Sequence, residues 1–418
     1  MFVISIFSAA AHVGLLVASV HGEPIVLPLT NSYVPLTLDN QTLNFAADSG
    51  SVASFAIYGP WYEGVYGAGS CRKLKTGCYF CPKHNPCEDI FSRRRRRVRF
   101  GSSEAFEYVR HRVTLGLGRT KTEFDFEFGL AVGYNKTSGP VHKVSGNLGL
   151  SISREGLRET FLEQLKERGA ISELSYGIKA KSYGRYISGT LILGASQTRS
   201  GPYVSFTRDP KYFARKVAVP LWPLRLLHYH GNLLTLRSGT GDAISRAGPQ
   251  HAPVPSLVDT GTSSLCISSS DFDRIIRSVK TSMHRRGTKT YEPIRLDPIK
   301  FINMVKEEAV PYLPTLVFDI GEAPHMVDIR IKPEHYIHSC RSGYCVLDIY
   351  RQGNGTVTIG HPFFRAYDVK FDLENYRIYI SPHEGSADRD AASRPARITR
   401  SKLGASRSRL RGIWGRKL

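Results

Sequence analysis

A short motif that occurs twice, half a chain apart, constrains the fold of this sequence more than any other feature. Each copy follows an apolar stretch and consists of an aspartate, a hydroxyl residue, a glycine and a second hydroxyl residue; the copies are Asp48-Ser49-Gly50-Ser51 and Asp259-Thr260-Gly261-Thr262. Glycine permits a tight turn beside the aspartate, and the hydroxyls can hydrogen-bond the carboxylate or a facing loop. One such motif is ordinary turn chemistry. Two copies, 211 residues apart in a chain of 418, predict an internal duplication whose two loops meet.

The sequence between Val34 and Pro382 predicts a mostly β protein. Its 41% of apolar residues can form a large core, and the composition excludes a coiled coil, a collagen-like chain and a multi-span membrane protein. Short alternating or β-branched runs between turn signals predict strands, for example at Tyr33–Leu38, Leu43–Ala47, Val52–Tyr58, Arg112–Leu117, Tyr186–Leu193, Leu316–Ile320, Val327–Ile331, Val346–Tyr350, Thr356–Ile359 and Val369–Leu373. Three segments have helical patterns: Leu157–Arg168 before Gly169, Ser269–Arg286 with Ser270 or Asp271 as its cap, and Leu296–Glu308.

These features together resemble the pepsin-like aspartic endopeptidases over roughly residues 30–382. Besides the two aspartate motifs, four segments are similar to family strands and occur in the same order: Val144–Ser151, Gly189–Gly194, Leu313–Asp319 and Val357–Asp372. The resemblance implies an all-β, bilobal pepsin-like fold with a few short helices and a central cleft. The expected lobes are residues 23–214, with an insert at 71–99, and 215–382.

The resemblance also implies a mechanism and its residues. Asp48 and Asp259 would form a dyad that shares one proton, because two carboxyls in near contact cannot both ionise. The ionised carboxylate would activate a water, and the protonated carboxyl would support the developing oxyanion and later help protonate the leaving amine. Ser49 and Thr260 would bond across the paired loops, Ser51 and Thr262 would orient the carboxylates, and Gly50 and Gly261 would allow the turns. No metal or other cofactor is expected.

Two substitutions and one short segment depart from the family. The flap hairpin that covers the cleft matches Val98–Glu104, where Phe100, before Gly101 and Ser102, replaces the usual tyrosine. The alternative interpretation is an ordinary phenylalanine in an edge strand. Phe55 stands where the family has a tryptophan, and only Glu23–Asn31 separates the expected leader from the first strand, which is too short for a pro-segment that plugs the cleft.

The cysteines indicate an oxidising compartment. Four of the seven cluster between the first aspartate motif and the flap, at Cys71, Cys78, Cys81 and Cys87. Two disulfides of undetermined pairing are favoured there over a zinc site. The position of this cluster resembles the Cys-rich insert of nepenthesin-type and plasmepsin-type relatives. Cys340 and Cys345 are predicted to close a small loop, and Cys266 to be a buried free thiol.

The ends of the chain predict targeting and a basic tail. Residues 1–22 are expected to be a cleaved secretory signal, with an uncleaved anchor as the alternative. The protein would then be secreted or lie in an endomembrane or vacuolar lumen, where Asn40, Asn135 and Asn354 are possible glycan sites. Residues 383–418 are basic, poor in apolar residues and expected to be disordered.

The net charge is +21, and the run Arg93–Arg97 has three interpretations: a solvated loop, a processing site or a patch for anionic ligands. No interleaved aromatic residues accompany the basic segments, so nucleic-acid binding is not predicted.

The sequence therefore predicts a monomeric aspartic endopeptidase with polypeptide substrates. The alternatives are a pepsin-fold binding protein with little or no catalysis, because fold alone does not determine function, and a secreted protein that binds anionic polymers or surfaces.

Overall fold

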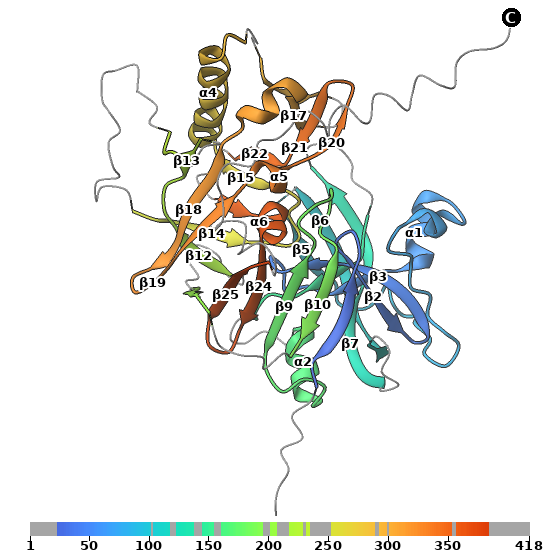
Figure 1. Ribbon diagram of the computed structural model, residues 1–418. Coiled ribbons are helices and arrows are strands. Elements are labelled where there is room, and N and C mark those ends of the chain that lie inside the picture. Colours follow the sequence, from blue (N-terminus) through green and yellow to red (C-terminus); the bar gives the residue numbers. More distant parts are fainter. Residues whose placement is uncertain are drawn as a thin grey trace, which may run out of the picture.

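The computed structural model confirms the expected mostly β fold with a few short helices (Figure 1). It describes residues 23–101, 103–117, 123–137, 144–153, 160–194, 201–206, 217–228, 231–234, 252–288, 292–298, 301–352 and 357–383. The expected signal at 1–22, the flap residue Ser102, the sequon at Asn354, the boundary between residues 214 and 215, and the tail from 384 onward lie outside these ranges. The division into lobes at that boundary therefore stays an expectation. Within the described part of the chain, no helix is long and apolar enough to cross a membrane.

One sheet is built from the N-terminal half of the chain. Its seven strands lie in the order β2 (Tyr33–Leu38), β3 (Gln41–Asp48), β8 (Asn147–Gly149), β4 (Phe55–Ile57), β7 (Glu123–Lys136), β6 (Glu104–Gly116) and β5 (Arg96–Arg99). In β2, Val34, Leu36 and Leu38 are buried and alternate with half-buried residues, which is the period that strands impose.

A second sheet repeats this arrangement in the C-terminal half. It runs β13 (Arg225–Leu227), β18 (Thr315–Glu322), β12 (Ala218–Leu221), β14 (Val254–Val258), β23 (Val357–Ile359), β15 (Leu265–Ser268) and β22 (Ile349–Gln352), with β19 (His325–Ile331) paired to β18. The two sheets share one pattern: β3 pairs in parallel with β8 and β4 with β7, just as β14 pairs with β23 and β15 with β22. The duplication seen in the motifs is thus a duplication of strand topology.

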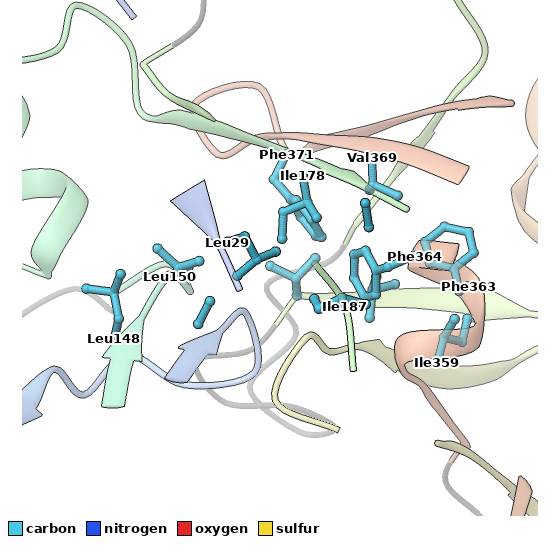
Figure 2. Packing of buried hydrophobic residues seen from close by; sticks show 14 of the residues in the cluster. Leu29, Leu148, Leu150, Ile178, Ile187, Ile359, Phe363, Phe364, Val369 and Phe371 are labelled. Carbon is cyan, nitrogen blue, oxygen red and sulfur yellow. The ribbon is translucent and has the colours of Figure 1, made fainter. Parts of the chain in front are cut away.

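A third sheet joins the two halves. It runs β1 (Ile25–Leu29), β10 (Gly189–Leu193), β9 (Ser175–Ala180), β24 (Tyr367–Asp372), β25 (Arg377–Pro382) and β11 (Tyr203–Ser205), so the N-terminal strands pair with the last strands of the fold. Figure 2 shows Ile178 and Phe371 of this sheet close to Phe364, and all three are fully buried. Each such side chain contributes about 1.5–3 kcal/mol on burial. This sheet holds the two motif-bearing sheets against a common core.

A four-stranded sheet and α4 lie together at the top of Figure 1. The sheet runs β16 (Ile294–Asp297), β17 (Ile302–Lys306), β21 (Tyr344–Leu347) and β20 (Ile337–Arg341). The other helices are α1 (Gly59–Tyr66), α2 (Phe161–Glu167), α5 (Pro333–Tyr336) and α6 (His361–Ala366), with 3₁₀ turns η1 (Ser70–Lys73) and η2 (Glu307–Tyr312).

The helix predictions need three corrections. The helix α4 spans Ser269–Arg285, one residue shorter than expected, and its cap is Ser268 rather than Ser270 or Asp271; Ser268 Oγ accepts a hydrogen bond from Asp271 N. The helix α2 begins at Phe161, because Thr160 adopts an extended backbone and caps it. The helix expected at Leu296–Glu308 is wrong.

That segment instead contains the end of β16, all of β17 and the start of η2. Asn303 and Val305 of β17 are buried at alternate positions, and β17 pairs with β21. Sheet pairing has overridden the local helical pattern there.

Candidate active site

Both aspartate loops are held by the same backbone framework. Asp48 ends β3 and Asp259 follows β14, and the parallel strands β8 and β23 lie behind them. Leu150 N donates to Asp48 O at 2.9 Å, and Asp259 N donates to Ile359 O at 3.0 Å. The segments Val144–Ser151 and Val357–Asp372, which resemble family strands in sequence, thus support the two loops.

A glycine lets each supporting strand approach its loop. A Cβ on Gly149 would lie 2.6 Å from the carbonyl carbon of Val52, and one on Gly360 would lie 2.3 Å from the oxygens of Thr262 and Ser264. Only glycine fits at these positions without moving the loops.

Four hydrogen bonds join the two loops to each other. Ser49 N donates to Thr260 Oγ1 and Thr260 N donates to Ser49 Oγ, both at 2.9 Å. The two hydroxyls in turn donate across the interface, Ser49 Oγ to Val258 O at 3.0 Å and Thr260 Oγ1 to Ala47 O at 2.8 Å. The pattern is symmetric and almost fully buried. It fixes the two aspartate-bearing backbones relative to each other.

This framework brings the two carboxyls together. Asp48 and Asp259 are only 6% and 8% exposed. A Cβ on Gly261 would lie 2.7 Å from Asp48 Oδ1 and 3.1 Å from Asp259 Oδ1, so these oxygens are no farther apart than the sum of the two distances, 5.8 Å. A Cβ on Gly50 would likewise lie 2.7 Å from Asp259 Oδ1. Each carboxyl therefore sits against the glycine of the opposite motif.

A backbone amide faces each carboxyl, and a threonine hydroxyl also donates to Asp259. Gly50 N donates to Asp48 Oδ1 at 2.9 Å, and Gly261 N donates to Asp259 Oδ1 at 2.8 Å. Thr262 Oγ1 donates to Asp259 Oδ2 at 2.7 Å, which is the orienting contact expected of this residue. Ser51 Oγ accepts a hydrogen bond from Ala53 N at 3.2 Å within its own loop.

The expected flap is a hairpin whose turn lies between β5 and β6. Phe100 N donates to Glu104 O at 2.8 Å, and Ser103 N donates to Phe100 O at 3.2 Å. The Phe100 ring lies 6.5 Å from that of Phe55 and 5.8 Å, edge to face, from that of Phe106. Gly101 is exposed at the turn. The hairpin thus packs on Phe55, the residue that stands where the family has a tryptophan.

Sequence reasoning missed a buried histidine behind the second loop. His361 is 2% exposed, and its Nε2 lies 2.9 Å from Thr260 O and 3.3 Å from Ser32 Oγ. Its Nδ1 is buried with no hydrogen-bond partner in the described part of the chain. Burial, reinforced by the nearby Arg365 charge, lowers the pKa of His361 to about 4. The one available signal was a polar residue directly after Gly360 in an apolar segment.

A buried tyrosine within reach of the charges of both aspartates was also missed. Tyr176 of β9 is fully buried and stacks on Phe371 with ring centres 4.5 Å apart. Burial raises the pKa of Tyr176 well above its ordinary value, and the charges of Asp259 and Asp48 act in the same direction. Its hydroxyl therefore stays protonated at neutral pH.

The cysteines form three disulfides, as expected, and the structure supplies the pairing. The pairs are Cys71–Cys78, Cys81–Cys87 and Cys340–Cys345. The four cysteines of the insert are consequently not available as zinc ligands. Among the described residues, no group of histidine, cysteine and acidic side chains is arranged to hold a metal ion.

Cys266 is unpaired, as expected, but half-buried rather than buried. Burial raises the pKa of its thiol to about 12, with a contribution from Asp259. The thiol therefore stays protonated and unreactive at neutral pH.

Comparison with known proteins agrees with this geometry. The family model described as eukaryotic aspartyl protease matches residues 114–383, a range that contains Asp259 and lies after Asp48. An aspartic proteinase from Irpex lacteus, solved as a crystal structure, is similar with a TM-score of 0.59 and 16% identity, over 86% of this chain and 97% of that one. At this identity the likeness establishes a shared fold. No curated protein matches the chain.

Proposed function

This chain belongs to the eukaryotic aspartyl protease family, and from that premise we propose that it is an active aspartic endopeptidase with Asp48 and Asp259 as its catalytic dyad. One observation carries the proposal. Two buried carboxyls lie within 5.8 Å of each other on loops that hydrogen-bond reciprocally through Ser49 and Thr260.

The geometry supports general acid–base hydrolysis. Two carboxyls this close repel when both are ionised, so the pair holds one proton in its working state. The proton belongs to the pair rather than to either residue. The ionised member removes a proton from a water molecule as that water attacks the peptide carbonyl, and the protonated member stabilises the oxyanion and then protonates the leaving nitrogen. The amides of Gly50 and Gly261 hold the inner oxygens in place.

A second candidate is a binding protein of the same fold with weak or no catalysis. The observation that favours it is the flap, where Phe100 and Phe55 replace the tyrosine and tryptophan of the family. Without the tyrosine hydroxyl and the indole N–H, these two side chains cannot form hydrogen bonds with the substrate or with water.

Asparagine variants separate the two candidates. Asp48→Asn and Asp259→Asn keep the side-chain shape but cannot share a proton, so each should lower peptide hydrolysis by at least about 10²–10⁴-fold. The double variant should be no slower than the singles, because the dyad acts as a unit. Hydrolysis of a peptide library at acidic and neutral pH measures this, and the unfolding temperature checks that the variants fold. Equal residual rates in the wild type and both variants would exclude the dyad and favour the binding protein.

We also place the protein in an oxidising, lumenal compartment of the secretory pathway, as a monomer that acts on polypeptides. The three disulfides support this location, since such bonds persist outside the cytosol. Mass analysis of the natively produced protein would test the cleavage after Gly22 and glycans at Asn40 and Asn135.

A further inference from the structure

The arginine run before the flap is only partly a loop. Its first member, Arg93, pairs with the exposed Asp89 at 2.6 Å, and Arg95 pairs with Glu107 at 3.1 Å. From Arg96 the chain enters β5, the first strand of the flap hairpin. The run therefore contains two anchored arginines and a basic strand.

The strand β5 is the open edge of the seven-stranded sheet. It pairs with β6 on one side, with Arg97 opposite Glu107 and Arg99 opposite Ala105, and no strand of the described residues pairs with its other side. Arg97 and Arg99 are exposed and alternate with the half-buried Arg96 and Val98. Side chains two residues apart on a strand point the same way, roughly 6.4–6.8 Å apart.

The charges on this strand are not neutralised by the described residues. Arg97 and Arg99 make no ion pair there, and the same holds for Arg94 before the strand. The two acidic residues of β6 next to the strand are occupied, since Glu107 binds Arg95, and Glu104 accepts from Tyr134 and pairs with Lys136. An open backbone edge thus carries two unpaired cations at strand spacing.

We propose that β5 is a docking strand for extended polypeptide segments with acidic residues two positions apart, and that these segments belong to the substrate. Such a segment would add to the open edge by main-chain hydrogen bonds, which give affinity, while its acidic side chains meet Arg97 and Arg99 and give selectivity. The inference rests on the proposed function, because the same hairpin carries Phe100 and packs beside the Asp48 loop through Phe55. The competing explanation is that the arginines only protect an edge strand from pairing with other chains.

Binding to the full chain tests the proposal without interference from hydrolysis. In the Asp259→Asn background, fluorescence anisotropy would compare a labelled eight-residue peptide that has glutamate at alternate positions with peptides that have glutamine or lysine there. Arg97→Gln combined with Arg99→Gln removes the two charges. Arg277→Gln combined with Arg341→Gln is the matched control, because both residues are exposed on other elements and the net charge changes equally.

The expected result is tightest binding of the glutamate peptide. The β5 double variant should weaken that binding by about three- to tenfold at about 50 mM salt, and by less at about 300 mM. The control variant should change it little. Equal affinity for the glutamate and glutamine peptides, or equal losses in the two double variants, would overturn the proposal. Self-association that appears only in the β5 variant would overturn it too, in favour of edge protection.

A parallel assay distinguishes a failure of this inference from a failure of the proposed function. It measures hydrolysis of a neutral peptide by the protein that retains Asp259. Dyad-dependent hydrolysis without any preference for acidic peptides would contradict docking and leave the endopeptidase. Acidic-peptide binding at β5 without dyad-dependent hydrolysis would contradict the endopeptidase and, with it, the statement that the docked segment is a substrate.

Discussion

Protonation of His361 should make the protein lose stability as the pH falls from 6.5 to 4. The imidazole is held neutral between the two halves of the site, with Nε2 at Thr260 O on one side and Ser32 Oγ on the other. A second proton would have to go to Nδ1, which is buried without a partner in the described residues. The positive charge would then face Arg365, while Asp348 and Asp259 only partly offset it.

The size of this effect follows from the shift in pKa. The pKa of His361 falls from 6.5 to about 4, a difference of about 2.5 units. Each unit corresponds to 1.36 kcal/mol, so the free energy of unfolding should change by about 3 kcal/mol. Because the folded-state pKa is lowered, the unfolded chain binds the extra proton first. The stability is therefore complete above pH 6.5, is lost progressively down to pH 4, and does not change further below it on account of this residue.

The assay is the pH dependence of denaturant unfolding in the wild type and in His361→Asn. Other groups titrate alike in both proteins, so the difference between the two curves isolates the histidine. We expect the wild type to lose about 3 kcal/mol more than the variant between pH 7.5 and pH 4. Parallel curves would refute the reasoning and mean that the ring is hydrated or already charged.

His383→Asn is a control in which the pH dependence of stability should have the opposite sign. The hydrogen bond from His383 to Asp368 raises the pKa of that histidine. Its stabilisation is therefore present at low pH and lost as the pH rises through the folded-state pKa, so this variant should be weakened most in acid.

Three further substitutions test the site. Gly261→Ala places a methyl group 2.7 Å from Asp48 Oδ1 and should lower hydrolysis by at least about 10²-fold while the protein still folds, as followed by kinetics and the unfolding temperature. Thr260→Val removes the acceptor for Ser49 N and the donor to Ala47 O, and should lower the free energy of unfolding by about 2–5 kcal/mol in denaturant titration. Phe100→Tyr should change turnover or peptide preference with at most about 1 kcal/mol effect on stability, since the Phe100 ring is only partly buried against Phe55 and Phe106; a larger loss of stability would mean that the added hydroxyl is buried without a partner.

The sequence could predict those contacts of the site in which both partners belong to the repeated aspartate motif. The motifs at Asp48 and Asp259 each follow an apolar strand, and a duplication requires their loops to meet, so the pairing of Ser49 with Thr260 could be anticipated. His361 could not, because its contact with Ser32 joins residues 329 positions apart and depends on how β23 and the first strands pack. Local pattern carries no information about such a neighbour.

The same limit explains the errors outside the site. The segment after Leu296 has helical spacing, but pairing with β21 decides its structure. The pairing of the four insert cysteines was left open, because four cysteines allow three pairings. The structure joins Cys71 to Cys78 and Cys81 to Cys87. The helix prediction failed because the deciding contact came from a distant segment.

The flap depends on both kinds of information. Its position was predicted from a short sequence match around Phe100, and its packing depends on Phe55, which is distant in sequence. A tyrosine hydroxyl at position 100 or an indole N–H at position 55 would each need a hydrogen-bond partner when buried. With Phe100 and Phe55 in contact, neither group is present and no partner is required. The rings of Phe106 and Tyr108 extend the same cluster, at 4.9 and 5.8 Å from Phe55. Besides the strand pairing of β6 with β7, aromatic packing thus fixes the end of the hairpin against β4, so the two departures from the family are a single, mutually consistent change. That change leaves the backbone of both aspartate loops untouched, which is why the hydrolysis assay, rather than the flap sequence, must decide between a protease and a binding protein.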